Sequence, residues 1–146
     1  MTGLTLLELM VVLAVLGMAS AVVSLAFRDP KAGHVEEEAL RLASLLESAR
    51  AHSRSMGLPV RWQVSSTGFV FEGMAPAQAL PHTWKHSGMQ AQVQGGEVLV
   101  LGPEPVIAPQ SVVVFSRAMP AFRWRVATDG VRPFGVRPAP SEPEVR

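Results

Sequence analysis

Residues 3–27 read GLTLLELMVVLAVLGMASAVVSLAF, and this stretch decides how the rest of the chain is interpreted. No residue from Leu9 to Phe27 is charged, and Glu8 is the single acid between Leu4 and Phe27. A helix over Leu4–Phe27 would be roughly 36 Å long, which is enough to cross the hydrocarbon core of a bilayer. The remaining chain is too short to surround an apolar helix of this length. We therefore predict a membrane-spanning helix over residues 4–27.

A secretory signal peptide is the alternative interpretation of the same stretch. Ala19–Ala21 resembles a weak small-residue cleavage site, but no basic residue precedes the apolar run. Under this alternative the protein would be a periplasmic domain with no role in a filament.

Glu8 lies near the N-terminal end of the predicted apolar helix. Thr5 and Glu8 form the pattern Thr-x-x-Glu, which is typical of a capping box at a helix N-terminus. The positive end of the helix dipole also favours an acid at this position. However, an ionised side chain costs about 3 kcal/mol at the centre of a bilayer and less near the end of the helix. A carboxylate retained in such a segment therefore indicates a partner of opposite charge.

The composition excludes several classes of protein. The chain has 146 residues, with 13 Lys and Arg against 12 Asp and Glu, and no Cys. The length indicates a single domain, and the net charge of +1 excludes binding by bulk charge. The lack of Cys excludes disulfides, thiol nucleophiles and thiolate metal sites.

The sequence after Phe27 predicts a second helical segment followed by antiparallel strands. Apolar residues at helical spacing predict an amphipathic helix over about residues 35–56, which ends at Gly57. Period-two alternation then predicts strands joined by turns. The expected elements are a hairpin over 60–72, a second hairpin over 89–101, a strand over 112–115, a strand over 122–126 that returns as 131–136, and a loose tail over 138–146. The predicted fold class is α+β, with a long N-terminal helix packed on antiparallel β-sheet.

The motif Gly3-Leu4-Thr5-Leu6-Leu7-Glu8, followed at once by the apolar run, resembles the class III signal of type IV pilins and type II secretion pseudopilins. In that family a prepilin peptidase cleaves after the glycine and methylates the new N-terminus. The resemblance implies a leader over residues 1–3, cleavage between Gly3 and Leu4, and N-methylation of Leu4. It also implies that Glu8 pairs with the N-terminal ammonium of a neighbouring subunit. Two features depart from the family: Leu4 stands where Phe is usual, and residues 1–3 include no Lys or Arg.

Within this family, the middle and the end of the chain look like the GspH/FimT group. The similarity is carried by residues 38–50, Gly57–Trp62, Gly68–Phe71 and 112–136. It implies a pilin-like fold in which the first half of the long helix spans the membrane and residues 28–137 form a periplasmic domain. The implied function is that of the GspH minor pseudopilins, which are structural and not enzymatic. Such a subunit assembles near the tip of the type II secretion pseudopilus and helps to export folded proteins across the outer membrane.

The resemblance also implies partners and a location. The partners would be other minor pseudopilins, the major pseudopilin and prepilin peptidase. The chain would cross the bacterial inner membrane once, with its C-terminal domain in the periplasm. Arg28 and Lys31 follow the apolar run, so counting positive charges alone would place the C-terminal domain in the cytoplasm. The resemblance implies the opposite orientation.

Arginines near the C-terminus form the candidate partner or nucleic-acid surface. Between Ser111 and Arg137 there are five arginines and a single acid, Asp129. Strand alternation places Arg123 and Arg125 on one face and Trp124 on the other. The candidate residues are Arg123, Arg125, Arg132 and Arg137. They indicate a solvated sheet face or a docking surface for another pseudopilin. The alternative family member, a type IV pilus minor pilin of the FimT/FimU kind, would use them to bind DNA phosphates without reading sequence.

No enzymatic site and no cofactor are predicted. The sequence contains no nucleophile-elbow, P-loop or dinucleotide-binding motif. His82 and His86 have the spacing of metal ligands on a helix, but Pro81 and Gly88 leave little room for a helix there. We therefore interpret both histidines as structural or solvated.

The acidic residues predict no metal site either. Glu36–Glu38 is interpreted as the acidic first turn of the second helical segment. Asp129, Glu142 and Glu144 near the C-terminus are too sparse for a calcium cage.

Overall fold

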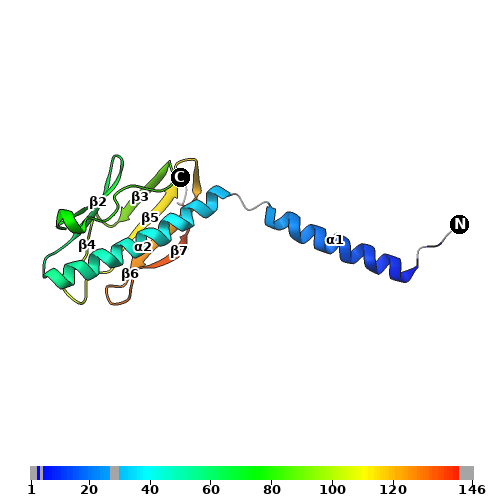
Figure 1. The fold of residues 1–146 in the computed structure, drawn as a ribbon, viewed down its shortest axis with the longest axis horizontal. Coiled ribbons are helices and arrows are strands. Elements are labelled where there is room, and N and C mark those ends of the chain that lie inside the picture. Colours follow the sequence, from blue (N-terminus) through cyan, green and yellow to red (C-terminus); the bar gives the residue numbers. More distant parts are fainter. Residues whose placement is uncertain (1–2, 4, 27–29, 142–146) are drawn as a thin grey trace. The chain divides into compact units, whose positions relative to one another are not determined.

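The computed structural model describes residue 3, residues 5–26 and residues 30–141 (Figure 1). The chain divides into two compact units, with the boundary between Pro30 and Lys31. Helix α1 (Leu6–Ala26) belongs to the first unit, and helix α2 (Pro30–Met56) starts at the boundary and continues through the second. The predicted boundary near residue 28 lies outside the described residues.

Helix α1 begins where Thr5 caps it. The Thr5 carbonyl accepts the Leu9 N–H at 3.1 Å, and Thr5 Oγ1 accepts the Glu8 N–H at 3.3 Å. The second bond is the N-cap half of the predicted capping box. The large apolar side chains from Leu6 to Met18 are exposed. Among the described residues, no helix is both long enough and apolar enough to span a membrane.

Helix α2 begins earlier than predicted, at Pro30 rather than near residue 35. Proline is well tolerated at the first helical position, because the N–H that it lacks would have no partner there. Gly33 costs about 1 kcal/mol inside a helix, and this cost is offset by burial of Val35, which is fully buried one turn inside the element. The interpretation of Glu36–Glu38 as the first turn is therefore wrong, since the first turn contains no acid.

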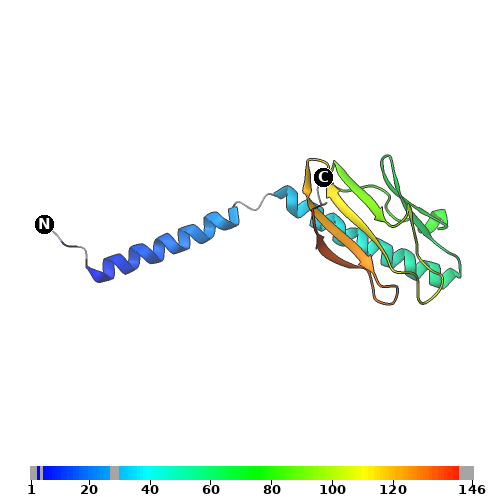
Figure 2. The ribbon, with the colours of Figure 1, turned by 180° about the vertical axis from the view of Figure 1, so that it is seen from behind.

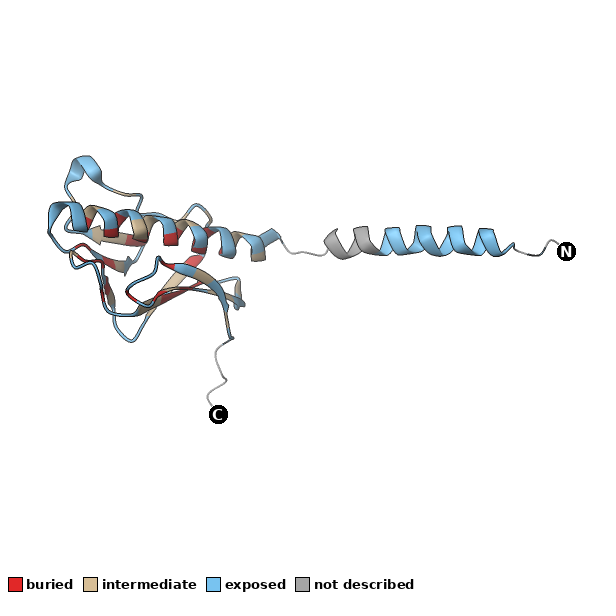
Figure 3. Ribbon diagram, turned by 90° about the horizontal axis from the view of Figure 1, so that it is seen from below, coloured by how far each residue is buried: buried red, intermediate tan, exposed pale blue. Residues whose placement is uncertain are grey.

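One stripe of α2 is buried against the strands (Figure 3). Its apolar members are spaced three or four residues apart: Val35, Ala39, Leu42, Ala43, Leu46 and Ala49. They join the inward side chains of both sheets in a single apolar cluster. The prediction that the second helical segment supplies the apolar face is confirmed.

The strands form two antiparallel sheets. The first has the order β2-β1-β4, with β1 Arg61–Ser65, β2 Gly68–Glu72 and β4 Val98–Val100. The second has the order β3-β5-β6-β7, with β3 Met89–Gln94, β5 Gln110–Ser116, β6 Met119–Thr128 and β7 Gly135–Ala139. A short 3-10 helix, η1, covers Pro76–Gln78. Helix α2 lies over one face of the second sheet, and the opposite face is turned toward the viewer in Figure 2.

The first predicted hairpin is present and the second is wrong. Strands β1 and β2 pair from Arg61↔Glu72 to Ser65↔Gly68. Strands β3 and β4, expected to pair with each other, enter different sheets: β3 pairs with β5, and β4 pairs with β1. The reason is packing, because Leu99 of β4 is fully buried opposite Trp62.

The last strand also differs from the prediction. The return strand expected over 131–136 begins at Gly135 and extends to Ala139, so the first residues of the predicted tail belong to β7. Pro138 is compatible with a strand here because β7 lies at the edge of its sheet. Residues 142–146 lie outside the described residues.

Candidate functional site

Three of the four candidate arginines lie on the outer face of the second sheet, and Arg132 lies in the loop between its last two strands. Arg125 of β6 is the register partner of Arg137 of β7, and Arg123 is the partner of Ala139. The intervening Trp124 packs against the core, so Arg123 and Arg125 share the opposite face, as predicted. We call Arg123, Arg125 and Arg137 the arginine row.

Arg125 and Arg137 make a like-charged pair across neighbouring strands. Neither guanidinium has a hydrogen-bond or ion-pair partner among the described residues. Like charges directly opposite each other destabilise a strand pair. A carboxylate or phosphate placed between two guanidinium groups would relieve this repulsion and accept charge-assisted hydrogen bonds from both.

Arg132 approaches the row from the β6–β7 loop (residues 129–134). It lines a hollow of ≈ 460 Å³ together with Arg125 and Arg137. Its Nε lies 2.9 Å from Asp129 Oδ2, and its side chain is 81% exposed. The backbone N–H groups of Arg132 and Val131 donate to Asp129 Oδ1 and lower the pKa of this carboxyl below its usual range. Asp129 therefore shapes the turn and neutralises part of the charge of Arg132.

A buried arginine on α2 holds the β6–β7 loop in place. The side chain of Arg50 is almost fully buried, and it donates to the carbonyls of Gly130 at 2.7 Å, Arg132 at 3.2 Å and Pro105 at 3.2 Å. Gly130 has φ = +94°, and a Cβ at this position would collide with the Ile107 carbonyl oxygen. The loop that presents Arg132 is thus built on Arg50 and Gly130, which the sequence analysis did not single out.

Arg123 is held by side chains of two neighbouring strands. Its guanidinium carbon lies 5.0 Å from the centre of the Phe115 ring, which is a cation–π distance. Its Nη2 donates to Gln92 Oε1 at 3.4 Å. Gln92 belongs to a run of glutamines at positions 90, 92 and 94, and this period-two spacing predicts that they share one face of their strand. Register pairs Gln92 with Val113, which in turn pairs with Arg125.

The residues predicted for processing and assembly lie in or near α1. Gly3 and Glu8 are exposed, and Leu4 lies outside the described residues. Nothing in the described contacts of Gly3 or Glu8 bears on cleavage, methylation or subunit pairing.

Glu37 connects α2 to the η1–β3 loop (residues 79–88). Its carboxylate accepts from Lys85 Nζ at 2.6 Å and lies 3.1 Å from His86 Nε2. Hydrogen bonds from Lys85 and then His86 lower the pKa of Glu37 to about 2. The ring of His86 also stacks on His34, with centroids 3.9 Å apart. His86 is therefore part of a contact between two elements, whereas His82 contributes its carbonyl to the Phe69 N–H.

Glu38 extends the same contact into the interior. Its side chain is fully buried, accepts the backbone N–H of His86 at 2.7 Å, and lies 3.3 Å from Arg41 Nη1. The same nitrogen of Arg41 donates to the Thr83 carbonyl at 3.0 Å. We call the contacts of Glu37, Glu38 and Arg41 with the η1–β3 loop the α2 clasp. Over the residues that the structure describes, no group of three or more His, Asp or Glu is arranged to hold a metal ion.

Comparison with solved structures identifies a protein of the same fold. The structure is similar to the crystal structure of the type IV minor pilin FimU of Pseudomonas aeruginosa (strain PAO1), with a TM-score of 0.55 and 13% sequence identity. The match covers 76% of this chain and 92% of the FimU chain. No family model and no curated protein matches the sequence. The chain therefore has the predicted α+β, pilin-like fold, in which a helix packs on antiparallel sheets.

Proposed function

We propose that this protein is a non-catalytic minor subunit of a pilin-like filament, and specifically a minor pseudopilin near the tip of a type II secretion pseudopilus. The pilin-like fold carries this proposal, together with the resemblance of Gly3–Glu8 to the class III signal. Its partners are other minor pseudopilins, the major pseudopilin and prepilin peptidase. Gene neighbours that encode a secretion ATPase and a secretin would support this system, whereas twitching or competence genes would contradict it.

The proposed role of α1 is to anchor and assemble the subunit. Its exposed apolar side chains from Leu6 to Met18 need an apolar environment, which the inner membrane supplies before assembly and neighbouring helices supply afterwards. In the proposed arrangement residues 1–3 are removed and the single-pass helix leaves the second unit in the periplasm. Glu8 then pairs with the methylated N-terminal ammonium at Leu4 of a neighbouring subunit, since each charge lacks solvent there.

Replacing the Glu8 carboxylate by an amide tests this arrangement. Gln also serves at the capping position, so Glu8→Gln should cost the isolated helix about 1 kcal/mol or less. In a desolvated pair it leaves an uncompensated ammonium, which costs several kcal/mol. We expect normal membrane insertion and at least a tenfold loss of co-purification with the other minor subunits.

The matched control is Glu97→Gln, which removes a carboxylate from the exposed β3–β4 turn. Mass spectrometry of the same samples should find a methylated Leu4 as the mature N-terminus in both variants. An intact Met1 or a cut near Ala21 would overturn the proposed processing. Equal recovery of the Glu8→Gln and Glu97→Gln complexes would show that the charge pair does not drive assembly.

A second candidate function is favoured by Arg125 and Arg137, which face each other across two strands and have no counter-charge among the described residues. Under this alternative the protein is a type IV pilus minor pilin whose arginine row binds nucleic-acid phosphates. Two guanidinium groups without a partner among the described residues suit a repeating anionic backbone and carry no information about base sequence.

The double variant Arg125→Gln/Arg137→Gln tests this alternative. If each arginine contacts one phosphate, the slope of log K against log salt for duplex DNA should fall by about 2. Fluorescence anisotropy of labelled DNA at several salt concentrations measures the slope. The control Arg54→Gln/Arg61→Gln removes two exposed arginines outside the row and should change the slope by less. Equal slopes for the two double variants would count against nucleic acid as the ligand of this row.

A further inference from the structure

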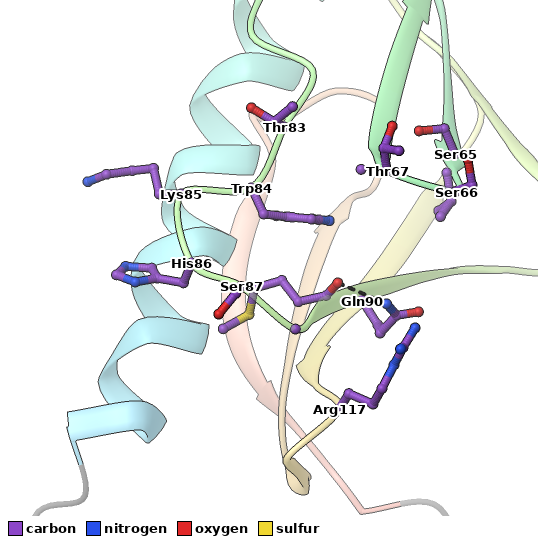
Figure 4. Close-up of a pocket in the computed structure, with 14 residues that line it drawn as sticks. Ser65, Ser66, Thr67, Thr83, Trp84, Lys85, His86, Ser87, Gln90 and Arg117 are labelled. Atoms are coloured by element: carbon purple, nitrogen blue, oxygen red, sulfur yellow. Dashed lines mark hydrogen bonds between the residues drawn. The ribbon is translucent and has the colours of Figure 1, made fainter.

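A polar hollow of ≈ 570 Å³ lies among four segments of the second unit (Figure 4). Its walls are the β1–β2 turn, the η1–β3 loop, the start of β3 and the β5–β6 turn. None of the four candidate arginines lines it, so it is separate from the surface described above. Its volume lies within the range of pockets that bind small ligands.

The cationic side chain that faces the hollow is Arg117 (Figure 4). Lys85 and His86 line it through their loop, but their side chains point away from it over α2 in Figure 4, and no Asp or Glu is among the lining residues. Lys85 and His86 are engaged by Glu37, but the Arg117 guanidinium has no hydrogen-bond or ion-pair partner among the described residues. In Figure 4 it points toward the amide of Gln90. A guanidinium without a partner, in a lining without acids, favours an anionic ligand such as a carboxylate.

Hydroxyl groups make up much of the remaining polar lining. Ser65 ends β1, Ser66 and Thr67 form the β1–β2 turn, and Ser87 belongs to the η1–β3 loop. None of these four side chains has a hydrogen-bond partner among the residues for which the structure gives contacts. A hydroxyl both donates and accepts, so this set matches a ligand that itself carries several hydroxyl groups.

The indole ring of Trp84 provides an apolar wall. It is half-buried and packs edge-on against Phe69, with ring centroids 4.8 Å apart, and Figure 4 shows it extending into the hollow. A sugar ring has an apolar C–H face that can lie on such a wall. A protein partner would instead require an apolar centre, whereas the apolar lining here is limited to Val64, Trp84 and Met89.

The hollow is held open by contacts outside its lining side chains. The α2 clasp fixes the η1–β3 loop through the His86 N–H and the Thr83 carbonyl. The Arg117 N–H donates to the Gly88 carbonyl at 2.8 Å, which joins the β5–β6 turn to the same loop. A preformed site of this kind loses little conformational entropy when a ligand binds.

We propose that this hollow binds an acidic saccharide. The sugar carboxylate pairs with Arg117, the sugar hydroxyl groups bond to Ser65, Ser66, Thr67 and Ser87, and one ring face lies on Trp84. This binding activity is independent of the filament role proposed above.

Titration of the full chain in detergent micelles with a trisaccharide of galacturonic acid tests the proposal. The 15N-labelled protein should show saturable shifts of the Trp84 indole N–H and of the Thr67 and Gly88 amides. Arg117→Gln should weaken binding about tenfold, because it removes a charge-assisted hydrogen bond. The control Arg54→Gln, an exposed arginine on α2, should leave the affinity unchanged.

Two further probes separate a saccharide site from a general anion site. The neutral trisaccharide of galactose should shift the same signals with an affinity at least tenfold lower. Inorganic phosphate and triglutamate should bind more weakly than the acidic trisaccharide. The proposal is overturned if the acidic trisaccharide causes no saturable shift at millimolar concentration, if either anion matches its affinity, or if its shifts map to the arginine row.

Discussion

At the scale of single residues, the β6–β7 loop that presents Arg132 depends on one buried side chain. Arg50 projects from α2 to three backbone carbonyls of the β6–β7 loop and the segment before Ile107. The carboxylate of Glu47 lies 3.6 Å away and also accepts the Phe134 N–H. The buried charge of Arg50 is thus balanced by Glu47, which also binds the backbone of the β6–β7 loop. These contacts connect the core of the second unit to the loop that presents Arg132.

Replacing Arg50 by Met should destabilise the second unit by about 3 kcal/mol. Met has a similar length but donates no hydrogen bond, so three carbonyls lose their donor in a site that excludes water. Denaturant unfolding of both proteins measures the difference. Arg54→Met, one turn further along α2 and exposed, should change stability by about 0.5 kcal/mol or less. Equal unfolding midpoints for the two variants would contradict the role given to Arg50.

At the scale of elements, the α2 clasp joins a helix to a long loop that has no regular structure next to the helix. Glu37, Glu38 and Arg41 lie at helical spacing and contact the loop at Thr83, Lys85 and His86. The loop belongs to neither sheet of the described chain, so these side chains provide hydrogen-bond partners for part of its backbone.

Gln110 gives the same kind of support to the edge strand β4. Its side-chain amide accepts from the Val100 N–H at 3.0 Å and donates to the Val100 carbonyl at 2.7 Å.

The clasp predicts a pH dependence. The pKa of the Glu37 carboxyl is about 2 in the folded protein, against 4.5 for a glutamate without these partners. The folded state therefore binds the carboxyl proton less tightly than the unfolded state does. The stabilisation by Glu37 should therefore be complete above about pH 4.5 and should be lost as the pH falls toward 2.

Thermal melts between pH 2 and pH 7 check this expectation. Glu37→Gln should melt below the wild type at neutral pH, and the gap should close as the pH falls through the range set by the two pKa values. The neighbouring Glu36 has no partner among the described residues, which makes Glu36→Gln the control for loss of a charge alone. A gap that is constant with pH would show that Lys85 and His86 do not stabilise the ionised carboxylate. His34, Glu38, Arg41 and Lys31 also lie in this region, and they are unchanged in both variants.

At the scale of the whole molecule, the two units have different requirements. The first unit consists of an apolar helix whose large side chains are exposed. The second contains every member of the buried apolar cluster, from Val35 to Phe134. The chain boundary falls between Pro30 and Lys31, and among the described residues the members of this cluster all follow it.

A fragment of residues 30–146 should therefore fold as a soluble monomer. It retains α2, both sheets and the α2 clasp, and it lacks the exposed apolar side chains of α1. Circular dichroism should show one cooperative thermal transition, and size-exclusion chromatography should give the monomer mass. An aggregated product or a broad transition would indicate that α1 contributes to folding of the second unit.

The sequence by itself determined the features that depend on local order along the chain. The uncharged run after Glu8 predicts α1, the i, i+3, i+4 spacing predicts the buried stripe of α2, and alternation predicts the β1–β2 hairpin and the shared face of Arg123 and Arg125. These follow from the periods of 3.6 and 2 residues at which side chains repeat on a helix and a strand. Helix α2 begins at Pro30 and not near residue 35, because proline is tolerated at the first helical position and Val35 is buried one turn later.

Only the tertiary structure decided which strands and side chains meet across long stretches of chain. The turn at Gly95–Gly96 suits a hairpin, yet β3 and β4 separate because Leu99 packs opposite Trp62 and Val93 pairs with Val112. The register that places Arg125 opposite Arg137, and the contacts of the α2 clasp, likewise join distant segments. Such pairings depend on shared burial of residues far apart in sequence, and hydrophobic burial has no direction along the chain. Periodicity therefore predicts which face a side chain occupies, and packing decides which residues it meets there.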